Sequence, residues 1–321
     1  MFTINRPVVR AAAAALCILA PTVLAAQGGV TIQQHTTFNV AHVTNADLQQ
    51  TVSILGTDRG KTVTTGKMKV LIISVDAGGT EIMRLDKDSV TKLDDKKKRY
   101  ETKSLAEKRA ELLKQQQDAA KSSEDAKEKD DTRYYAVVDE ARRTGEKKVI
   151  NGFNTEQVSI KITIMGENTK TGKAAPYMHL ITDSWIDPSQ REAEQIRREY
   201  AAAQRRALGA DPMMAANPYA KWLSNVDGEM AKVPGYPIRT TLSFESEVDS
   251  ATAAENRQPK PSVSPLGGAI GGLFGRKKAD TAAASGSGRP VLFTSTVEVL
   301  SISLTRPAAS EFEIPAGYTK K

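Results

Sequence analysis

The sequence predicts an α+β protein built mainly on antiparallel strands. Short segments with apolar residues at every second position recur along the chain, which is the spacing of half-buried strands. Short polar turns join them, with no helix between each pair, and this favours antiparallel pairing. The segments with helical patterns are insertions between these strands. The expected strands are 30–40, 67–75, 80–85, 89–93, 157–164, 177–186, 236–244 and 291–304.

The segment 157–164 alternates most regularly among these strands. Its even positions place four branched apolar residues on one face, namely Val158, Ile160, Ile162 and Ile164. Residues 76–79 (Asp-Ala-Gly-Gly) and 86–88 (Asp-Lys-Asp) have the composition of hairpin turns, because glycine and aspartate adopt the backbone angles that tight turns need. We therefore expect hairpins on both sides of the strand at 80–85.

The N-terminal 26 residues have the organisation of a secretory signal peptide. Arg6 and Arg10 precede an apolar run at 11–20, and small residues stand at Ala25 and Ala26. The run is about half as long as the ~20 residues that a spanning helix needs, so cleavage after Ala25 or Ala26 is the favoured interpretation over an uncleaved anchor. We expect an exported protein of the periplasm, with one domain over residues 27–321.

Composition excludes several kinds of chemistry from the mature chain. Cys17, the only cysteine, lies in the leader, so a disulfide, a thiol nucleophile and a thiolate metal site are excluded. The net charge of +7 falls to +5 when the leader's two arginines are removed. So small an excess argues little for nucleic acid in an exported protein, and we expect no nucleic-acid partner. We expect a monomer.

A highly charged insertion spans residues 103–132. Ser104 and Glu107 form a capping-box pattern that starts a helix. The helix that follows contains only three large apolar residues, Leu105, Leu112 and Leu113, among many charges of both signs. With so little apolar surface it is expected to be solvent-exposed and frayed at a break at Ser122 and Ser123.

Two further helices are expected after the strand at 177–186. The first has Asp187 as N-cap, Pro188 at its first position, Gly209 as its stop and a thin apolar stripe. The second runs from Pro218 to about Ala231 and has a wide apolar face, which we expect to pack on the sheet. That face consists of Tyr219, Trp222, Leu223, Val226 and Met230.

Residues 249–289 are dominated by alanine, glycine, serine and proline, which predicts a flexible linker. Within it, "PLGGAIGGLFGRKK" fails as a phosphate loop, because Leu273 and Phe274 stand where lysine and serine or threonine belong. It could be a plain tether or a tip that touches an anionic membrane surface. The residues of such a tip are Leu266, Ile270, Leu273, Phe274, Arg276, Lys277 and Lys278.

No catalytic motif stands out. The three histidines, His35, His42 and His179, have no metal-ligand spacing, and the chain has no Gly-x-Ser-x-Gly elbow. The acid pairs 94–95 and 130–131 are flanked by lysines and lack the shielded setting that separates the pKa values of catalytic carboxyls. We therefore expect no catalytic residue, no metal and no cofactor.

The end of the chain, "EFEIPAGY" at 311–318, follows the strand "VEVLSISL" and resembles the closing signature of periplasmic domains with the lipoprotein-carrier-like fold (the LolA, LolB and LppX type). In particular it is similar to a bacterial family of unknown function within or near that group. Other segments fall in the same order as in the family, namely "DKKKRYET", "GEKKVINGFNTEQVSI", "ITDSWID" and "GYPIRTTLSF". The charged helix and the glycine-rich insertion depart from the carriers.

The resemblance implies a curved, open half-barrel of about 10–11 strands with helices on its concave side. It also implies that an apolar ligand, a lipid or acyl chain, or a lipidated partner is held between sheet and helix near the outer membrane. The alternative is an envelope structural or adaptor protein whose own side chains fill this core and which binds a protein partner. The residues that would line the hollow are Tyr219, Trp222, Leu223, Val226, Met230, Val158, Ile160, Ile162, Leu242 and Phe244.

Overall fold

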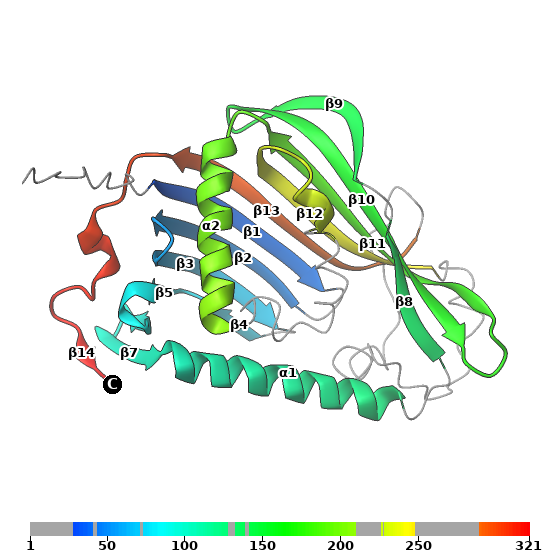
Figure 1. The fold of residues 1–321 in the computed structure, drawn as a ribbon, viewed down its shortest axis with the longest axis horizontal. Helices are drawn as coiled ribbons and strands as arrows, with labels where there is room; N and C mark the ends of the chain where they lie inside the picture. The colour runs from blue at the N-terminus through cyan, green and yellow to red at the C-terminus, as the bar shows by residue number, and fades with distance from the viewer. Residues whose placement is uncertain are drawn as a thin grey trace, which may run out of the picture.

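One open, curved sheet of fourteen strands makes up most of the structure, a computed structural model (Figure 1). The mainly antiparallel α+β class is confirmed, with more strands than the ten or eleven expected. The predicted signal peptide and most of the 249–289 linker, including its apolar tip, lie outside the described residues. The described residues are 28–40, 44–70, 73–127, 132–138, 141–209, 226, 228–247 and 289–321.

Within the described residues, the elements follow one another as strands, with the α-helices α1 and α2 inserted between them. The strands are β1 (Gly29–Val40), β2 (Thr44–Leu55), β3 (Arg59–Val70), β4 (Ile73–Asp76), β5 (Gly79–Arg84), β6 (Ser89–Asp94), β7 (Arg99–Ser104), β8 (Thr132–Val138), β9 (Arg142–Ile150), β10 (Phe153–Asn168), β11 (Ala174–Asp187), β12 (Tyr236–Ser246), β13 (Val291–Ser303) and β14 (Thr319–Lys320). The helices are α1 (Leu105–Lys127), α2 (Arg191–Leu208) and the short 3-10 turns η1 (Leu85–Lys87) and η2 (Ala309–Phe312).

The strand order is β14-β7-β6-β5-β3-β2-β1-β13-β12-β11-β10-β8, with β4 on β3 and β9 on β10. Every pair is antiparallel except β14 with β7. The sheet is open, because the strands at the two ends of this order, β14 and β8, do not pair with each other. Since β12 pairs with β13, the insertion between them leaves and re-enters the sheet at neighbouring strands.

The segment 67–75 is a correction to the expected strands. It is not one strand: Lys67 of β3 pairs with Asp76 of β4, so the chain folds back within it. Nor do residues 76–79 form a hairpin turn, because β4 and β5 both pair with β3 and continue in one direction. Periodicity alone missed this, because a run of consecutive apolar residues does not show where a strand reverses. The turn at 86–88 is confirmed, since η1 joins the paired strands β5 and β6.

The alternation predicted for 157–164 is confirmed in β10. Val158, Ile160, Ile162 and Ile164 are all buried, and they share one face of the strand. Residues between them are less buried, as the period of two in a strand requires.

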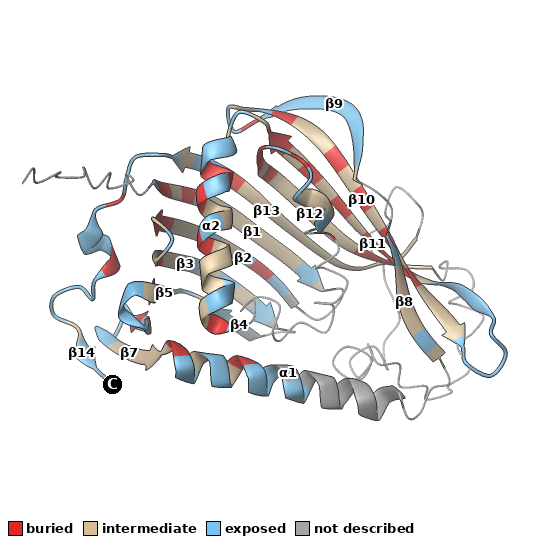
Figure 2. Cartoon of the chain, in the orientation of Figure 1, coloured by how far each residue is buried: buried red, intermediate tan, exposed pale blue. Residues whose placement is uncertain are grey.

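Helix α2 lies across one face of the sheet, which we call the inner face (Figure 1). Its buried side (Figure 2) places Ala193, Ile196 and Tyr200 in one cluster with Val30 and Ile32 of β1. The helix with the thin stripe therefore packs on the sheet, contrary to the expectation that the later helix would do so. A thin stripe suffices because glycines allow close approach: Ile196 lies against Gly28, just before β1, and Tyr200 against Gly60 of β3.

The start of α2 also differs from the prediction. The helix begins at Arg191, with Gln190 as its N-cap, three residues after Pro188. The Asp187 carboxylate instead accepts hydrogen bonds from the backbone N–H (2.8 Å) and hydroxyl (2.7 Å) of Ser189, so it stabilises the turn that precedes the helix. The stop at Gly209 is confirmed by a left-handed backbone, φ 69°. This conformation favours glycine.

The later helix, predicted over 218–231, is described only at Val226 and at 228–230, which are helical. Val226 is buried and Met230 partly buried against β10, β11 and β12. Tyr219, Trp222 and Leu223 lie outside the described residues.

Helix α1 begins as predicted at a capping box. The Glu107 carboxylate accepts from the Ser104 backbone N–H (2.7 Å), and the Glu107 N–H donates to the Ser104 hydroxyl. The helix runs through 122–123 to Lys127 without a break. It is anchored more firmly than expected, because Leu105 and Leu112 pack against Leu208 of α2.

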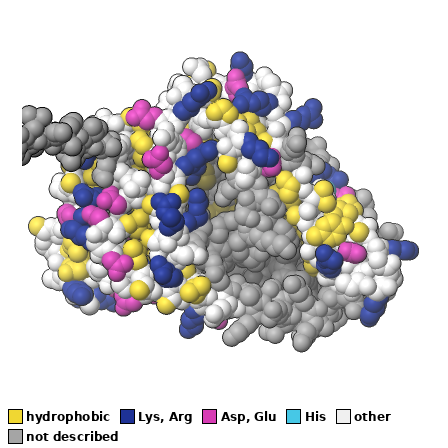
Figure 3. All heavy atoms as spheres, in the orientation of Figure 1, with side chains coloured by type: hydrophobic (Ala, Val, Ile, Leu, Met, Phe, Trp, Pro, Cys, Tyr) yellow, Lys and Arg dark blue, Asp and Glu magenta, His cyan; other side chains and the backbone are white. Residues whose placement is uncertain are grey.

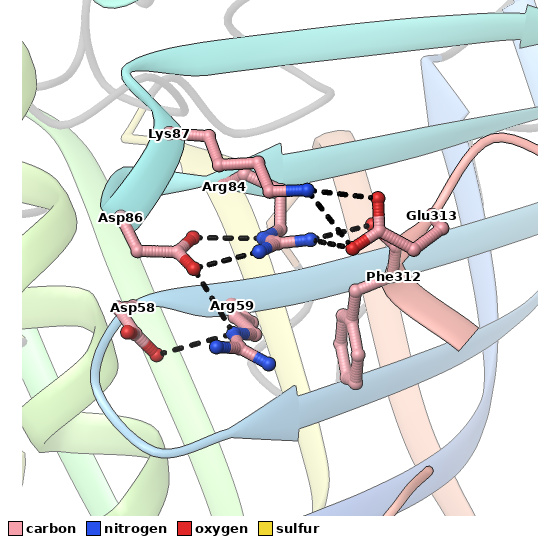
Figure 4. A network of polar contacts seen from close by, with 7 residues as sticks. All are labelled: Asp58, Arg59, Arg84, Asp86, Lys87, Phe312 and Glu313. Atoms are coloured by element: carbon pink, nitrogen blue, oxygen red, sulfur yellow. Dashed lines mark hydrogen bonds and ion pairs between the residues drawn. The ribbon is translucent and has the colours of Figure 1, made fainter. Parts of the chain in front are cut away.

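The chain end covers the outer face of the sheet. Phe312 is buried with Leu55 and Ile82. An ion-pair network holds the segment there (Figure 4): the Arg84 guanidinium donates to both Asp86 oxygens (2.7 Å each) and to Glu313, which also accepts from Lys87.

Candidate binding face

The candidate site is the part of the inner face that α2 leaves uncovered. Pairing registers define a row of side chains that crosses seven strands on this face. Residues directly opposite in antiparallel strands share a face. The row consists of Met68, Ala46, Phe38, Ser295, Leu242, Thr182 and Ile160.

A second row runs beside the first, toward the strand ends. It is almost wholly apolar and consists of Val40, Phe293, Phe244, Leu180 and Ile162. The rings of Phe244 and Phe293 meet edge to face, with centroids 5.7 Å apart. In the space-filling view, hydrophobic side chains gather near β8 and the adjoining parts of β10 and β11, and Lys and Arg side chains gather over α2 (Figure 3).

Polar side chains separate these rows from the core beneath α2. Gln34 donates to the Gln50 side chain (2.8 Å), and Gln50 in turn donates to the Thr64 hydroxyl (3.4 Å). Thr36 also donates to Gln50. On β1, β2 and β3 the inner face therefore changes along the strands from apolar under α2, through a hydrogen-bonded polar ladder, to apolar again at the strand ends.

The structure brings the described members of the predicted lining together. Ile160, Ile162, Val226 and Phe244 belong to one buried cluster, which we call the β10–β12 cluster. Its other members are Ile164, Met178 and Leu180. Leu242 and Met230 pack on it, and Val158 lies in the adjoining cluster with Ile186 and Val233. The seven residues of the predicted tip at 266–278 lie outside the described residues.

Several residues of the face were not predicted. Phe38, Leu48 and Met68 come from the first three strands, and Phe293 comes from β13. The alternation at 30–40 and 291–304 could have identified Phe38 and Phe293. Leu48 and Met68 carried no such signal, because β2 was not predicted and the strand predicted at 67–75 had the wrong bounds.

A buried histidine lies on the opposite face, at the base of the 248–288 insertion. His179 bonds through Nε2 to Glu247 and through Nδ1 to the Thr163 hydroxyl (3.2 Å). Glu247 is also paired with Arg289 (3.1 Å), the first described residue after the insertion. Burial raises the pKa of Glu247, but hydrogen bonds from His179 and Arg289 outweigh it and leave that pKa below its ordinary value. The two ring nitrogens thus join β11 to β10 on one side and to Glu247, which follows β12, on the other.

The other titratable groups make no obvious reaction centre. His35 of β1 pairs with Asp47 of β2 (2.7 Å) at a partly exposed position. No group of three or more His, Cys, Asp or Glu side chains with metal-binding geometry exists among the described residues. Likewise, no helix within the described ranges is long and apolar enough to cross a membrane.

Two small polar grooves lie away from the inner-face rows, beside β6, β7 and the start of α1, with volumes of about 90 and 190 Å³. Lys92 and Glu101 line both grooves, and Lys103 lines the smaller one. Lys103 is paired with Glu111 across one of them, and this hydrogen bond holds the pKa of Glu111 below its usual value. Side chains already paired with one another offer little to a ligand.

The chain matches no protein-family model and no curated protein. A solved structure from Vibrio parahaemolyticus, provisionally described as an outer membrane lipoprotein-sorting protein domain, aligns with 89% of this chain and 90% of its own. The sequence identity is 6% and the TM-score 0.24. A TM-score this low does not establish a shared fold.

Proposed function

We propose that the protein is an exported, non-catalytic binding protein of the cell envelope. It holds an apolar group, either a lipid or acyl chain or a lipidated partner, between the inner face and the segment that carries Val226 and Met230. One observation carries the proposal: apolar side chains from β1, β10, β11, β12 and β13 form a continuous row at the strand ends, outside the area that α2 covers. Burying each CH₂ of an acyl chain there would contribute about 0.8 kcal/mol.

The expected compartment supports this role. The leader at 1–26 directs the chain to the periplasm. The resemblance of the mature chain to lipoprotein carriers points to the outer membrane. The 266–278 tip would touch an anionic bilayer surface, since it combines apolar side chains with Arg276, Lys277 and Lys278. Replacing Leu273 and Phe274 with serine should then weaken vesicle binding, whereas unchanged binding identifies a tether.

Lipid extraction and native mass spectrometry of protein purified from its own compartment test the binding proposal. The matched variants are Phe38→Asp and Asn39→Asp, which introduce the same charge at neighbouring positions on opposite faces of β1. We expect co-purifying lipid to be lost from the Phe38 variant and kept by the Asn39 variant. A wild-type protein that carries no lipid and binds none when it is offered would reject the proposal.

A second candidate is an adaptor that binds a protein partner through α1. The observation in its favour is that the β10–β12 cluster is filled by its own side chains, with Ile162 and Leu180 fully buried. Leu113 on α1 is 47% exposed, beside the exposed Lys114. Leu113→Asp combined with Lys114→Glu should abolish cross-linking to the partner without unfolding the protein. Unchanged cross-linking excludes this surface.

A further inference from the structure

Thr182 of β11 has a buried hydroxyl without a hydrogen-bond partner. Six serines and threonines are buried in the described part of the chain. Five of them, Ser53, Thr80, Thr91, Thr155 and Ser184, bond to a side chain or a carbonyl oxygen. Thr182 is 3% exposed, and its Oγ1 has no partner among the described residues. An unsatisfied buried hydroxyl destabilises a protein, so its presence requires a physical reason.

The hydroxyl belongs to the candidate binding face. Thr182 pairs with Ile160 on one side and Leu242 on the other, so it points to the inner face with them. Both neighbours are part of the apolar packing around Val226 and Phe244. A hydroxyl in this setting has hydrocarbon on each side of it.

Thr182 also marks a boundary along the strand. The next inner-face residue toward α2 is Ser184, whose hydroxyl is bonded to Thr240 (3.1 Å). The next in the other direction is Leu180, which is fully buried. Val226 packs in the same buried cluster as Leu180, so a ligand reaches this position only by displacing the segment that carries Val226. A ligand with an apolar chain and one polar group would then match this order, with its chain over Leu180 and its polar group at Thr182.

We propose that Thr182 donates a hydrogen bond to the carbonyl oxygen at the head of an acyl chain. This inference rests on the proposed function and narrows the ligand from any apolar group to an acyl ester or amide. The carbonyl oxygen of either group supplies the acceptor that the hydroxyl lacks, and the ester adds no donor that would itself need a partner. Thr182 would then determine specificity, selecting acylated molecules over plain hydrocarbon.

The test compares three probes with the same number of non-hydrogen atoms: methyl decanoate, N-methyldecanamide and tridecane. Their affinities are measured by displacement of the apolar dye phenylnaphthylamine from the purified mature chain. Tridecane gains more free energy than the carbonyl probes on leaving water, so the carbonyl preference is the ratio of the affinity of the better carbonyl probe to that of tridecane, compared between proteins. We expect this ratio to be about tenfold higher in wild type than in Thr182→Val, as one hydrogen bond allows. Tighter binding of the ester than of the amide would indicate that the ligand is a glycerolipid acyl group. Tighter binding of the amide would indicate an N-acylated protein. Either result supports the proposal.

Three variants locate the effect. Thr182→Val keeps the shape and removes the hydroxyl, so it should remove the carbonyl preference and leave tridecane binding unchanged. Thr182→Ser keeps the hydroxyl and should keep the preference. Thr240→Val removes a satisfied hydroxyl one row away and should also keep the preference. A ratio of carbonyl-probe to tridecane affinity that is the same in Thr182→Val as in wild type overturns the proposal.

Unfolding of the ligand-free variants gives a second readout. Thr182→Val should keep or raise the thermal midpoint, because no hydrogen bond is lost, whereas Thr240→Val should lower it. A comparable fall in both variants would show that Thr182 already has a partner within the protein, and this overturns the proposal. If wild type and Thr182→Val bind the carbonyl probes equally tightly, only this inference fails; if wild type binds no probe, the proposed function fails as well.

Discussion

The ring of Tyr200 lies directly over Gly60, so closely that a Cβ atom at this position would overlap the tyrosine hydroxyl and Cζ. Tyr200 is held in a core with Ala193 and Ile196, where burial raises the pKa of its hydroxyl well above the ordinary value. This contact sets the distance between α2 and β3, and therefore determines where the helix crosses the inner face.

Gly60→Ala should destabilise the protein by about 1–3 kcal/mol, because overpacking forces the ring or α2 to move. Urea unfolding of the single variant measures the loss. Tyr200→Leu also destabilises the protein by itself, but it removes the overlap, so the double variant should lose less than the sum of the two. Additive losses would contradict a direct contact.

Leu112 and Leu113 are neighbours in α1 with opposite environments, at 2% and 47% exposure. Leu112→Ala should cost about 2–5 kcal/mol, since it leaves a cavity against Leu208. Leu113→Ala should change stability by less than about 0.5 kcal/mol. Thermal unfolding of the two variants provides the comparison, and equal losses would mean that α1 does not dock through Leu112.

Ser104→Ala should shorten or fray the start of α1. The hydroxyl accepts from the Glu107 N–H (3.2 Å), and loss of such an N-cap typically costs about 1 kcal/mol. Hydrogen exchange of residues 105–108 should accelerate in this variant. The first turn of α2, residues 191–194, has no such side-chain cap, and its hydrogen exchange serves as the reference. An equal acceleration there would indicate a global effect.

The attachment of the chain end should weaken in acid. Hydrogen bonds from Arg84 hold the pKa of Asp86 below its ordinary value. Burial raises the pKa of Glu313, but the hydrogen bonds from Arg84 and Lys87 lower it by more than burial raises it. The pKa of Glu313 is therefore below its ordinary value. A lowered pKa in the folded state means that the carboxylates stabilise the protein above about pH 4, their unfolded range, and that this contribution is lost as the pH falls through the lowered values.

Hydrogen exchange at 309–313 between about pH 6 and pH 3 measures this release. Glu313→Gln should reduce its pH dependence, because the glutamine cannot titrate. Glu192→Gln, at an exposed position on α2, should leave it unchanged. A pH profile that is identical in wild type and Glu313→Gln would show that the network does not control the chain end.

Much of the sheet was predictable because its signals are local. The alternation in β10 and the turn at 86–88 reflect a period of two and the backbone preferences of single residues, and both appear in the structure. β9 carried no alternation: eight of its nine residues are exposed, and it is a strand only because β10 provides a partner. The hairpin of β3 and β4 was missed for a related reason, since pairing and not composition decides where the chain reverses.

The candidate site was predictable in part. Ile160, Ile162 and Phe244 were recognisable from strand periodicity. That Phe38 of β1 shares a row with Ile160 of β10 follows only from the order in which the strands pair. The orphan hydroxyl of Thr182 could not be predicted either, because satisfaction of a hydrogen bond depends on neighbours distant in the sequence.

By itself the sequence determined the antiparallel class, the helix start at Ser104, the stop at Gly209 and the buried face of β10, because each depends on residues within one or two turns of chain. The tertiary structure alone decided that α2 covers the sheet, that Leu112 docks on Leu208 and that a polar ladder crosses β1, β2 and β3 on the inner face. These features depend on contacts between distant segments, which local periodicity does not encode.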